Sequence, residues 1–382
     1  MTAKVVGFGQ YLERNSEKKS FDILYASAKD AVSMAGLEFS DIDGFIFSST
    51  AGTVEDPLRS MLADQVGDYF GLKKLTYMDT VDLGGSSFNA MLYRAVRAAS
   101  EGKAKNILVV GGGKGSIRKK DTSIGKVYER YYSKPISVHE FLPLSDYALI
   151  TNFYNQKYRA SNEGRAMIAV RERANANNNP DAVFHGDLDL EKVMSSPVVS
   201  TPLHLLECAS PSDGSTSYVI SNTNLTNGPD IIVKAYGEAH DPRPLAERSD
   251  LTEIPATISI AKAKEQAEVK NKDIDHFMFY DAFTTMVMIE LESAGLAKKG
   301  EGWKFAEDNS FSFDGDLPIN TNGGTLNMSQ PAFMSGGVIL YEAFLQLSGK
   351  AKGRQVKDLH RSMVNALGGT MNHSTTIILE VQ

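Results

Sequence analysis

The feature that most constrains the fold is a pattern that occurs twice, far apart along the chain. Residues 41–47 read D-I-D-G-F-I-F, and residues 273–279 read D-I-D-H-F-M-F, 232 positions later. In each copy the alternating phenylalanines predict a strand, and the residues before them carry apolar side chains at helical spacing. Gly36 predicts the end of the first of these helices.

A second repeat follows each copy. Residues 84–87 and residues 336–337 both precede an apolar helical stretch, and Leu92 of the first corresponds to Leu340 of the second, 248 positions later. Each stretch is followed by a strand pattern and then by glycines. Two repeats in the same order predict duplication of a β-α-β-α-β unit. The chain is therefore expected to have an α/β fold with mainly parallel sheets covered by helices.

The repeats also divide the chain. We expect an N-terminal half made of residues 1–113 and 196–226, and a C-terminal half made of residues 227–382. Residues 114–195 break the pattern and are expected to form an inserted loop region with its own short helices. A chain of 382 residues is long enough for two sizeable cores. Inserted segments of this kind often bind substrate.

Composition excludes several classes of protein. The formal net charge is −7 and neither half is strongly basic, so nucleic acid is not an expected partner. The single cysteine, Cys208, cannot form an internal disulfide, and no metal site is expected. The N-terminus reads as a strand rather than a signal peptide, and no apolar stretch is long enough to cross a membrane. The expected location is the cytoplasm.

Four stretches, spread over nearly the whole chain, resemble the thiolase superfamily, particularly its sterol-carrier-type and archaeal branch of acetyl-CoA acetyltransferase-like proteins. They are residues 202–215 (P-L-H-L-L-E-C, then D-G-S), 280–296 (Y-D-A-F-T, then L-E-S-A-G-L), 317–324 (L-P-I-N-T-N-G-G) and 368–374 (G-G-T, then H-S). The resemblance implies a thiolase-like fold of two duplicated halves with layered sheets and helices. It also implies a homodimer formed through the first half, and a coenzyme A thioester as substrate without a bound cofactor or metal.

The chain departs from thiolases at the residues that carry their chemistry. Thiolases place a reactive cysteine at a helix N-terminus, where the helix dipole stabilises the thiolate. By resemblance that cysteine falls on Gly85, the histidine that activates it falls on Gln330, and a second cysteine falls on Ala282. Joint replacement of three interacting groups indicates a change of mechanism.

Similar replacements characterise the thiolase-like retro-aldolases that cut acyl-CoA side chains from steroids. Those enzymes also have glycines in place of the cysteine, and Tyr-Asp-x-Phe-Thr where this chain has residues 280–284. The resemblance implies that Tyr280 is a catalytic tyrosine. A second tyrosine of that group falls near Gln330.

Each candidate residue has a functional and a structural interpretation. Tyr280 is a general acid/base if nearby donors stabilise its phenolate, and otherwise a packed strand-end tyrosine. Asn320 and Gln330 carry amides that could donate to a thioester or enolate oxygen, or could only support their loops. His373 is either a proton carrier or a histidine bonded to backbone.

The remaining candidates are backbone positions and nucleophiles. Gly85 and Ser86 could offer N–H groups to a carbonyl oxygen, whereas Ser86 as a nucleophile lacks an identifiable base. Asp281 is expected to fix its loop, and four more glycines are expected to shape substrate-binding loops: Gly323, Gly324, Gly368 and Gly369. Cys208 is expected to be a buried structural thiol.

A basic stretch follows the glycines at residues 111–113. It lacks the spacing of a phosphate-binding loop, so nucleotide hydrolysis is rejected. Its cations, Lys114, Arg118, Lys119 and Lys120, either meet the phosphates of coenzyme A or form a solvated loop.

The sequence therefore favours a cysteine-independent enzyme that makes or breaks a carbon–carbon bond of an acyl-CoA thioester by an aldol-type reaction. Two alternatives remain: an acetyl-CoA acyltransferase that transfers the acyl group directly with a partner subunit, and a non-catalytic acyl-CoA-binding scaffold. By resemblance, a small partner protein with a zinc ribbon and an OB-fold is also expected.

Overall fold

The computed structural model describes residues 3–48, 62–115, 143–223, 225, 229–332 and 335–381. Arg118, Lys119 and Lys120 lie outside these ranges. Within them, no helix is both long enough and apolar enough to cross a membrane.

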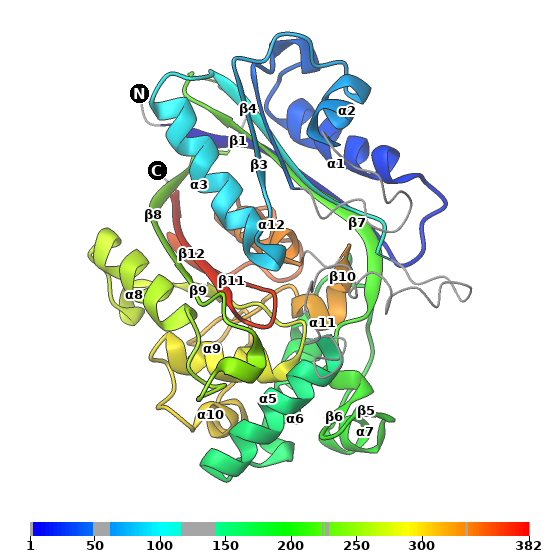
Figure 1. Cartoon of the computed structure of the whole chain (residues 1–382), viewed down its shortest axis with the longest axis vertical. Coiled ribbons are helices and arrows are strands. Elements are labelled where there is room, and N and C mark those ends of the chain that lie inside the picture. The colour runs from blue at the N-terminus through cyan, green and yellow to red at the C-terminus, as the bar shows by residue number, and fades with distance from the viewer. Residues whose placement is uncertain are drawn as a thin grey trace.

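One long sheet runs through both halves of the chain, and its strand order repeats (Figure 1). Its path is β3 (Tyr77–Val81), β2 (Gly44–Ser48), β4 (Asn106–Gly113), β7 (Pro211–Ser221), β1 (Lys4–Glu13), β8 (Ile231–His240), β12 (His373–Val381), β11 (Arg361–Gly368) and β9 (His276–Met278). β1 and β8, the first strands of the two halves, are neighbours in the middle of the sheet. On its other side each of them pairs with the last strand of its own half, β7 or β12. A parallel bridge between Phe277 and Ile319 stands where β3 stands in the first half. The predicted duplication is therefore visible in the strand order.

The sheet is mixed, whereas the sequence predicted mainly parallel pairing. β2 is parallel to β3 and β4, and β9 is parallel to β11. β7 is antiparallel to β4 and β1, and β12 is antiparallel to β11 and β8. The turn between β11 and β12 spans only residues 369–372, and so short a connection can join only antiparallel neighbours.

Short strands complete the sheets. β10 (Gln330–Pro331) runs parallel to the start of β7, and β5 (Val198–Ser200) pairs with β6 (Leu203–His204).

Helices cover the sheet in layers. They are α1 (Ser20–Met34), α2 (Leu62–Tyr69), α3 (Ser87–Ser100), α5 (Pro143–Tyr158), α6 (Asn162–Ala176), α7 (Leu190–Ser195), α8 (Ala256–Ala267), α9 (Thr284–Ser293), α10 (Gly302–Asp308), α11 (Gly324–Met328) and α12 (Gly336–Leu347). α3 and α12 lie centrally between the halves, whereas α1 and α2 cover the outside of the first half and α8 that of the second (Figure 1).

Strand alternation explains this layering. Phe45 and Phe47 belong to the cluster of buried side chains that includes α1 and α2, whereas Ile46 belongs to the larger cluster that includes α3 and α12. Successive side chains of a strand point to opposite faces, so β2 is buried on both sides. The predicted helix starts at residues 84–87 and 336–337 are confirmed, since α3 begins at Ser87 and α12 at Gly336.

The repeated aspartates make corresponding hydrogen bonds in the two halves. The carboxylate of Asp43 accepts hydrogen bonds from the backbone N–H groups of Lys105 and Asn106, where β4 begins. The carboxylate of Asp275 accepts the corresponding N–H groups of His360 and Arg361, where β11 begins. Each aspartate therefore joins the start of one strand to the start of its parallel neighbour.

The region expected as an insertion contains α5, α6 and α7 in its described part. α6 packs against α9, α10 and α11, which all belong to the second half of the chain. The boundaries at residues 113, 195 and 226 stay a prediction. This packing brings side chains of α6 to the residues at the end of β9.

Candidate active site

Three glycine segments from both halves meet at the N-terminal ends of α3 and α12. A β-carbon added at Gly336 would lie 1.9 Å from the carbonyl oxygen of Gly85. A β-carbon at Gly368 would lie 1.9 Å from the carbonyl oxygen of Leu83, and one at Gly84 would lie 3.1 Å from the amide nitrogen of Gly369. The backbones approach so closely that only glycine fits, which explains the glycine pairs in the sequence.

The ring of Tyr280 occupies the space beside Gly85. A β-carbon added at Gly85 would lie 2.4 Å from two ring carbons and from the hydroxyl oxygen of Tyr280. Any side chain at position 85 therefore collides with the tyrosine in this arrangement. By the resemblance described above, position 85 is where thiolases carry their cysteine, so the Tyr280 ring as it lies here leaves no room for that cysteine.

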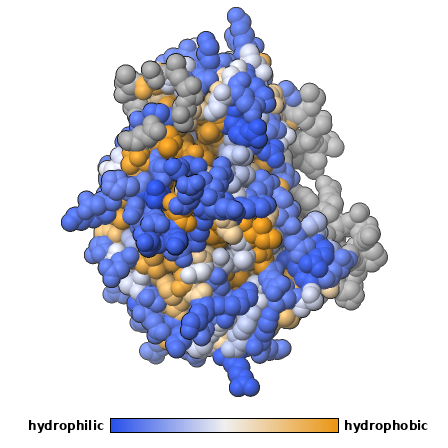
Figure 2. All heavy atoms as spheres, turned by 90° about the vertical axis from the view of Figure 1, so that its left-hand side faces the viewer, coloured by the Kyte–Doolittle hydropathy of each residue, from blue (hydrophilic) through white to orange (hydrophobic). Residues whose placement is uncertain are grey.

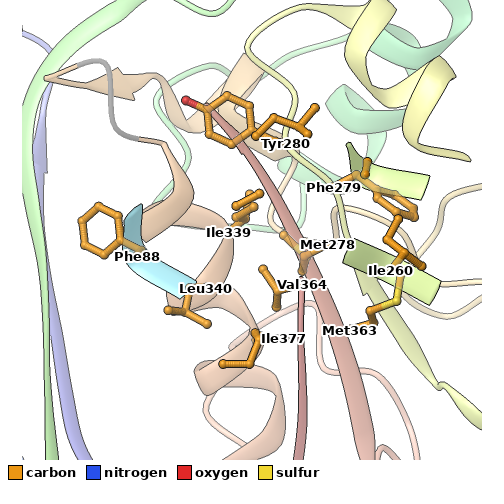
Figure 3. Packing of buried hydrophobic residues seen from close by; sticks show 14 of the residues in the cluster. Phe88, Ile260, Met278, Phe279, Tyr280, Ile339, Leu340, Met363, Val364 and Ile377 are labelled. Carbon is orange, nitrogen blue, oxygen red and sulfur yellow. The ribbon is translucent and has the colours of Figure 1, made fainter. Parts of the chain in front are cut away.

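The hydroxyl of Tyr280 points away from the apolar core. Figure 3 shows the ring near the start of α12, with Phe88 and Ile339 among the apolar side chains below it. The Nε2 atom of Gln330 donates to the Tyr280 oxygen over 3.3 Å. Burial raises the pKa of Tyr280 above its usual value, and hydrogen bonds from Ser335 and Gln330 act in the opposite direction.

The backbone on both sides of Tyr280 is held by buried side chains. The Oδ1 atom of Asn320 accepts the N–H of Phe279 over 2.8 Å, and the Oε1 atom of Glu290 accepts the N–H of Tyr280 over 3.1 Å. Asp281 accepts the N–H groups of Thr325 and Leu326 over 2.8 and 2.9 Å. Asp281 is thus bonded to loop backbone, as its structural interpretation expected.

The side chain of Asn320 is fully buried and committed on both ends. Its Nδ2 atom donates to Oε1 of Glu172 over 2.7 Å, and its Oδ1 atom is the acceptor for Phe279. Gly323 and Gly324, which follow it, have φ angles of +95° and +66°. A β-carbon at Gly324 would lie 2.1 Å from Oδ2 of Asp281, so this glycine allows the loop to close over the carboxyl groups.

Ser86 is buried within the 3-10 turn (Gly84–Ser86) that precedes α3. Its hydroxyl donates to the carbonyl oxygen of Leu83 over 2.7 Å, and its N–H donates to the same oxygen over 3.3 Å. Its carbonyl accepts a hydrogen bond from Thr375 over 2.8 Å. These bonds fix the turn beside Gly85.

His373 lies at the start of β12, opposite Gly368, and is not hydrogen-bonded to Tyr280 within the described residues. Its Nδ1 atom is 2.9 Å from Nδ1 of His240, and Nε2 of His240 is 2.6 Å from Oε1 of Glu238. Burial, followed by the electrostatic effect of His240, lowers the pKa of His373. The structure therefore assembles Tyr280, Gln330 and Asn320 around the end of β9, with His373 in a separate polar chain.

Three residues near Tyr280 were not found from the sequence: Tyr147, Glu172 and Glu290. The hydroxyl of Tyr147 donates to the carbonyl of Gly369 over 3.0 Å, and its ring stacks on Phe283 with centroids 4.4 Å apart. Glu290 could have been noticed, because a carboxylate within the apolar run M-V-M-I-E-L is unusual in a buried helix. Nothing in the local sequence of Tyr147 or Glu172 indicates proximity to residue 280.

Two further expectations concern Cys208 and Lys114. Cys208 is half-buried, its thiol lies 3.4 Å from the carbonyl oxygen of His204, and burial raises its pKa to about 12. Lys114 was expected in a coenzyme A site or a solvated loop. It is instead buried, and its ammonium group donates to the carbonyl oxygens of Ser16 and Lys18. A charge held by backbone carbonyls in this way fixes the loop before α1.

In the part of the chain that the structure describes, no group of three or more His, Cys, Asp or Glu side chains could hold a metal ion.

Comparison with known proteins gives a family match for the C-terminal part of the chain and a fold for the whole of it. Residues 237–381 match the family described as thiolase C-terminal domain-like. The chain is 29% identical over 360 residues to an acetyl-CoA acetyltransferase of Methanothermobacter thermautotrophicus, and the match covers 91% of each chain. It is 27% identical over 353 residues to a steroid side-chain-cleaving aldolase of Thermomonospora curvata, and that match covers 87% of this chain and 88% of the other.

A solved structure of an Ltp2-ChsH2(DUF35) aldolase superposes with a TM-score of 0.86 at 24% identity, covering all of this chain and 98% of that one. Over its whole length the chain therefore has a thiolase-like fold, and residues 237–381 match the family described as thiolase C-terminal domain-like.

Proposed function

We propose that the chain cleaves or forms a carbon–carbon bond of an acyl-CoA thioester by an aldol-type reaction, with Tyr280 as the acid/base. One observation carries the proposal: the ring of Tyr280 fills the space that a side chain at position 85 would need. The Tyr280 ring as it lies here leaves no room for a thiolase nucleophile at position 85, which supports acid/base rather than covalent chemistry. Among its relatives, the steroid side-chain-cleaving aldolase supports this reaction class.

The proposed cleavage balances without any other reactant. The Tyr280 phenolate takes the proton of a β-hydroxyl group, and the oxygen–hydrogen electron pair becomes the new carbonyl bond. The bond between the α- and β-carbons breaks, and its electrons form the enolate of the thioester. Tyr280 then returns the proton to the α-carbon. The products are a carbonyl compound and a shortened acyl-CoA, and the reverse sequence is the condensation.

Several groups would hold the substrate. We propose that the N–H groups of Gly85 and Ser86 and the amide of Gln330 lie toward the thioester or enolate oxygen. Gln330 is the candidate that already reaches the Tyr280 hydroxyl. Asn320 would support the site through its bond to the Phe279 N–H, and Gly368 and Gly369 would line it.

The test is turnover of a β-hydroxyacyl-CoA by Tyr280→Phe, which removes one oxygen and keeps the ring. We expect the rate to fall by about 10²–10⁴, the usual worth of a positioned proton-transfer group. Because the pKa of Tyr280 is raised, cleavage by the unmodified protein should increase with pH through the neutral range, and the residual rate of Tyr280→Phe should not.

Two control variants accompany this test. Tyr218→Phe also removes a buried hydroxyl, one that donates to the carbonyl oxygen of Phe88. Cys208→Ala removes the thiol. Both should retain turnover. If Tyr280→Phe keeps its rate within about threefold, far less than a proton transfer is worth, the aldol mechanism is wrong.

The acyltransferase named above remains the second candidate, because a relative that covers most of the chain is named an acetyl-CoA acetyltransferase. Direct acyl transfer would release free coenzyme A from acetyl-CoA only when an acyl acceptor is present to take the acetyl group, and would not depend on the Tyr280 hydroxyl. The scaffold alternative predicts acyl-CoA binding, measured by calorimetry, with no turnover of either kind.

We also propose a homodimer and a small partner with a zinc ribbon and an OB-fold. The similar solved structure is named for two proteins, Ltp2 and ChsH2(DUF35), which supports a partner. Figure 2 shows apolar atoms gathered in patches among hydrophilic side chains on one face, a pattern common on surfaces that bind proteins. Light scattering of the purified chain, alone and with the product of a neighbouring zinc-ribbon gene, tests both.

A further inference from the structure

One face of α6 holds the loop of residues 319–324, which begins beside β9. Glu172, Asn175 and Asn179 are spaced as neighbours along one side of α6 and its C-terminal extension, and all three are buried. Asn175 donates to the carbonyl oxygen of Ile319 over 3.0 Å, and Asn179 donates to that of Asn322 over 3.0 Å. The loop of residues 319–324 is therefore held by α6 as well as by its own half of the chain.

Glu172 is the member of this face that reaches both sides of Tyr280. Its Oε1 atom accepts a hydrogen bond from Asn320, whose other amide atom holds the N–H of Phe279. Its Oε2 atom lies toward Asp281. A single point, the β-carbon position at Gly324, is 2.1 Å from Oδ2 of Asp281 and 2.7 Å from Oε2 of Glu172. The carboxyl group of Glu172 thus contacts Asn320, which holds the N–H of Phe279, and also lies beside Asp281.

This arrangement needs a proton between the two carboxyl groups. Glu172 and Asp281 are fully buried, and two buried negative charges in contact would be strongly unfavourable. Asp281 already accepts three hydrogen bonds, from the N–H and hydroxyl of Thr325 and the N–H of Leu326. Glu172 accepts one. The Oε2 atom of Glu172 is buried and has no hydrogen-bond partner among the described residues, so a proton on Glu172 would let this atom donate to Asp281.

We infer that Glu172 is a positioning residue, a neutral carboxylic acid that holds the Tyr280 hydroxyl in place from α6 by bonding both Asn320 and Asp281. It acts on the active site only through these two residues. This inference rests on the proposed role of Tyr280, and it adds that the region between the two halves supplies an essential part of the site.

Most of the groups that face Glu172 favour its neutral form, and the hydrogen bond from Asn320 acts in the opposite direction. Burial, followed by the charge of Asp281, raises the pKa of Glu172 well above its usual value, and Glu290 from α9 adds to the effect. The cations on α6 have other partners: Arg165 pairs with Glu207, Arg171 bonds carbonyl oxygens of α10, and Arg173 bonds Asn327. From α11, the facing groups are Thr325 and backbone N–H groups. No cation is hydrogen-bonded to Glu172 in the described ranges.

The test compares Glu172→Gln with Glu172→Ala. Glutamine can donate to Asp281 and accept from Asn320, but cannot ionise. We therefore expect Glu172→Gln to keep kcat for a β-hydroxyacyl-CoA within about threefold at neutral pH. Glu172→Ala should lose about 10²-fold in kcat, the order expected when a reacting group is displaced by about 1 Å, with a smaller change in KM.

The pH profile separates positioning from simple structural support. In the unmodified protein, ionisation of Glu172 at alkaline pH would place two charges together and reduce the rate. Glu172→Gln should lack that alkaline decrease. Glu163→Gln, the same change at an exposed position on α6, should leave the profile unchanged. An alkaline decrease that persists in Glu172→Gln would overturn the inference.

Infrared spectroscopy provides a readout that does not depend on activity. The spectrum of the unmodified protein minus that of Glu172→Gln should contain the carbonyl band of a protonated carboxylic acid, and the corresponding Glu163→Gln difference should not. If the band is absent, Glu172 is ionised and the inference is wrong. If the band is present while Tyr280→Phe stays active, the proton assignment stands and the role of Tyr280 fails. The infrared result also decides the matter if Glu172→Ala does not fold.

Discussion

At the scale of single residues, the feature that defines the site is that side chains at positions 85 and 280 compete for the same space. A cysteine needs a side chain at position 85, and a tyrosine at position 280 needs that same volume empty. The exchange preserves an acidic hydrogen close to the N-termini of α3 and α12, but moves it to a phenol carried by the other half. In the proposed mechanism the reacting oxygen belongs to Tyr280, just after β9, so the residues that support this segment become part of the site.

This exchange predicts the effect of Gly85→Ala. The added methyl group would overlap the Tyr280 ring and displace it, so we expect turnover to fall by at least tenfold. We also expect a loss of about 1–3 kcal/mol in the free energy of unfolding, which is typical of overpacking. Urea denaturation and steady-state kinetics measure the two effects.

Gly67→Ala is the control for that experiment. Gly67 lies within α2, and nothing lies within 4 Å of the position of an added β-carbon. Alanine is the better helix former there, so stability should rise slightly and turnover should not change. Full activity of Gly85→Ala would show that Tyr280 tolerates a side chain at position 85.

At the scale of elements, the repeated D-I-D pattern is explained by the two aspartates that join parallel strands. Asp43→Asn and Asp275→Asn should each lower the free energy of unfolding by about 1–3 kcal/mol, because each change weakens two hydrogen bonds to backbone N–H groups. The two losses should be similar, since the contacts correspond. Asp68→Asn, an exposed position in α2, should have little effect. A large difference between the first two variants would mean that the halves have diverged in function at these turns.

The sequence predicted where helices and strands occur better than it predicted the directions in which the strands run. Glycines beside apolar helical stretches located the starts of α3 and α12, because a glycine and a periodicity are local signals. Alternation of helices and strands does not determine which way the closing strands β7 and β12 run. That direction follows from the lengths of the connections, and it makes the sheet mixed.

The candidate site was predicted in the same partial way. Tyr280, Gln330 and Asn320 come together around the end of β9. In the sequence, Glu172 cannot be told from a surface glutamate. Its contact with Asp281 joins positions more than 100 residues apart. Only the packing of α6 against the second half brings it to the site. His373 lies opposite Gly368, and its neighbour His240 lies on a different strand, which its position in the sequence does not indicate.

At the scale of the whole molecule, the second half has a buried polar network that the first half lacks at the corresponding strand. His276 replaces Gly44 at the start of the repeated strand, 232 positions later. Its ring nitrogens lie 2.9 Å from the hydroxyls of Ser362 and Thr321, and Thr321 donates to Glu342. Because the Thr321 hydroxyl donates to Glu342, Nε2 of His276 is the donor to Thr321. The Ser362 hydroxyl can donate to Nδ1 or accept from it, and burial favours the neutral imidazole, in which Nδ1 accepts.

This network makes global stability depend on pH. Burial lowers the pKa of His276 to about 4 in the folded protein, against about 6.5 when unfolded. Between these values the unfolded chain takes up a proton that the folded chain does not, so stability is present above pH 6.5 and is lost as the pH falls. The loss from this one group approaches about 1.4 kcal/mol per pH unit. The buried carboxyl groups with raised pKa values, Glu172 and Glu290, act with the opposite sign.

His276→Gln isolates the contribution of the histidine, because both proteins share every other titrating group. Glutamine keeps a donor and an acceptor but cannot take up the proton. The free energies of unfolding of the two proteins, measured by urea denaturation from pH 4.5 to 7, should converge as the pH falls, at about 1.4 kcal/mol per unit below pH 6. Parallel curves would mean that His276 is protonated in the folded protein. The second half would then hold a buried positive charge opposite Glu342, and the Thr321 hydroxyl, whose bond to His276 ties the loop after β9 to its strand, would have a different partner.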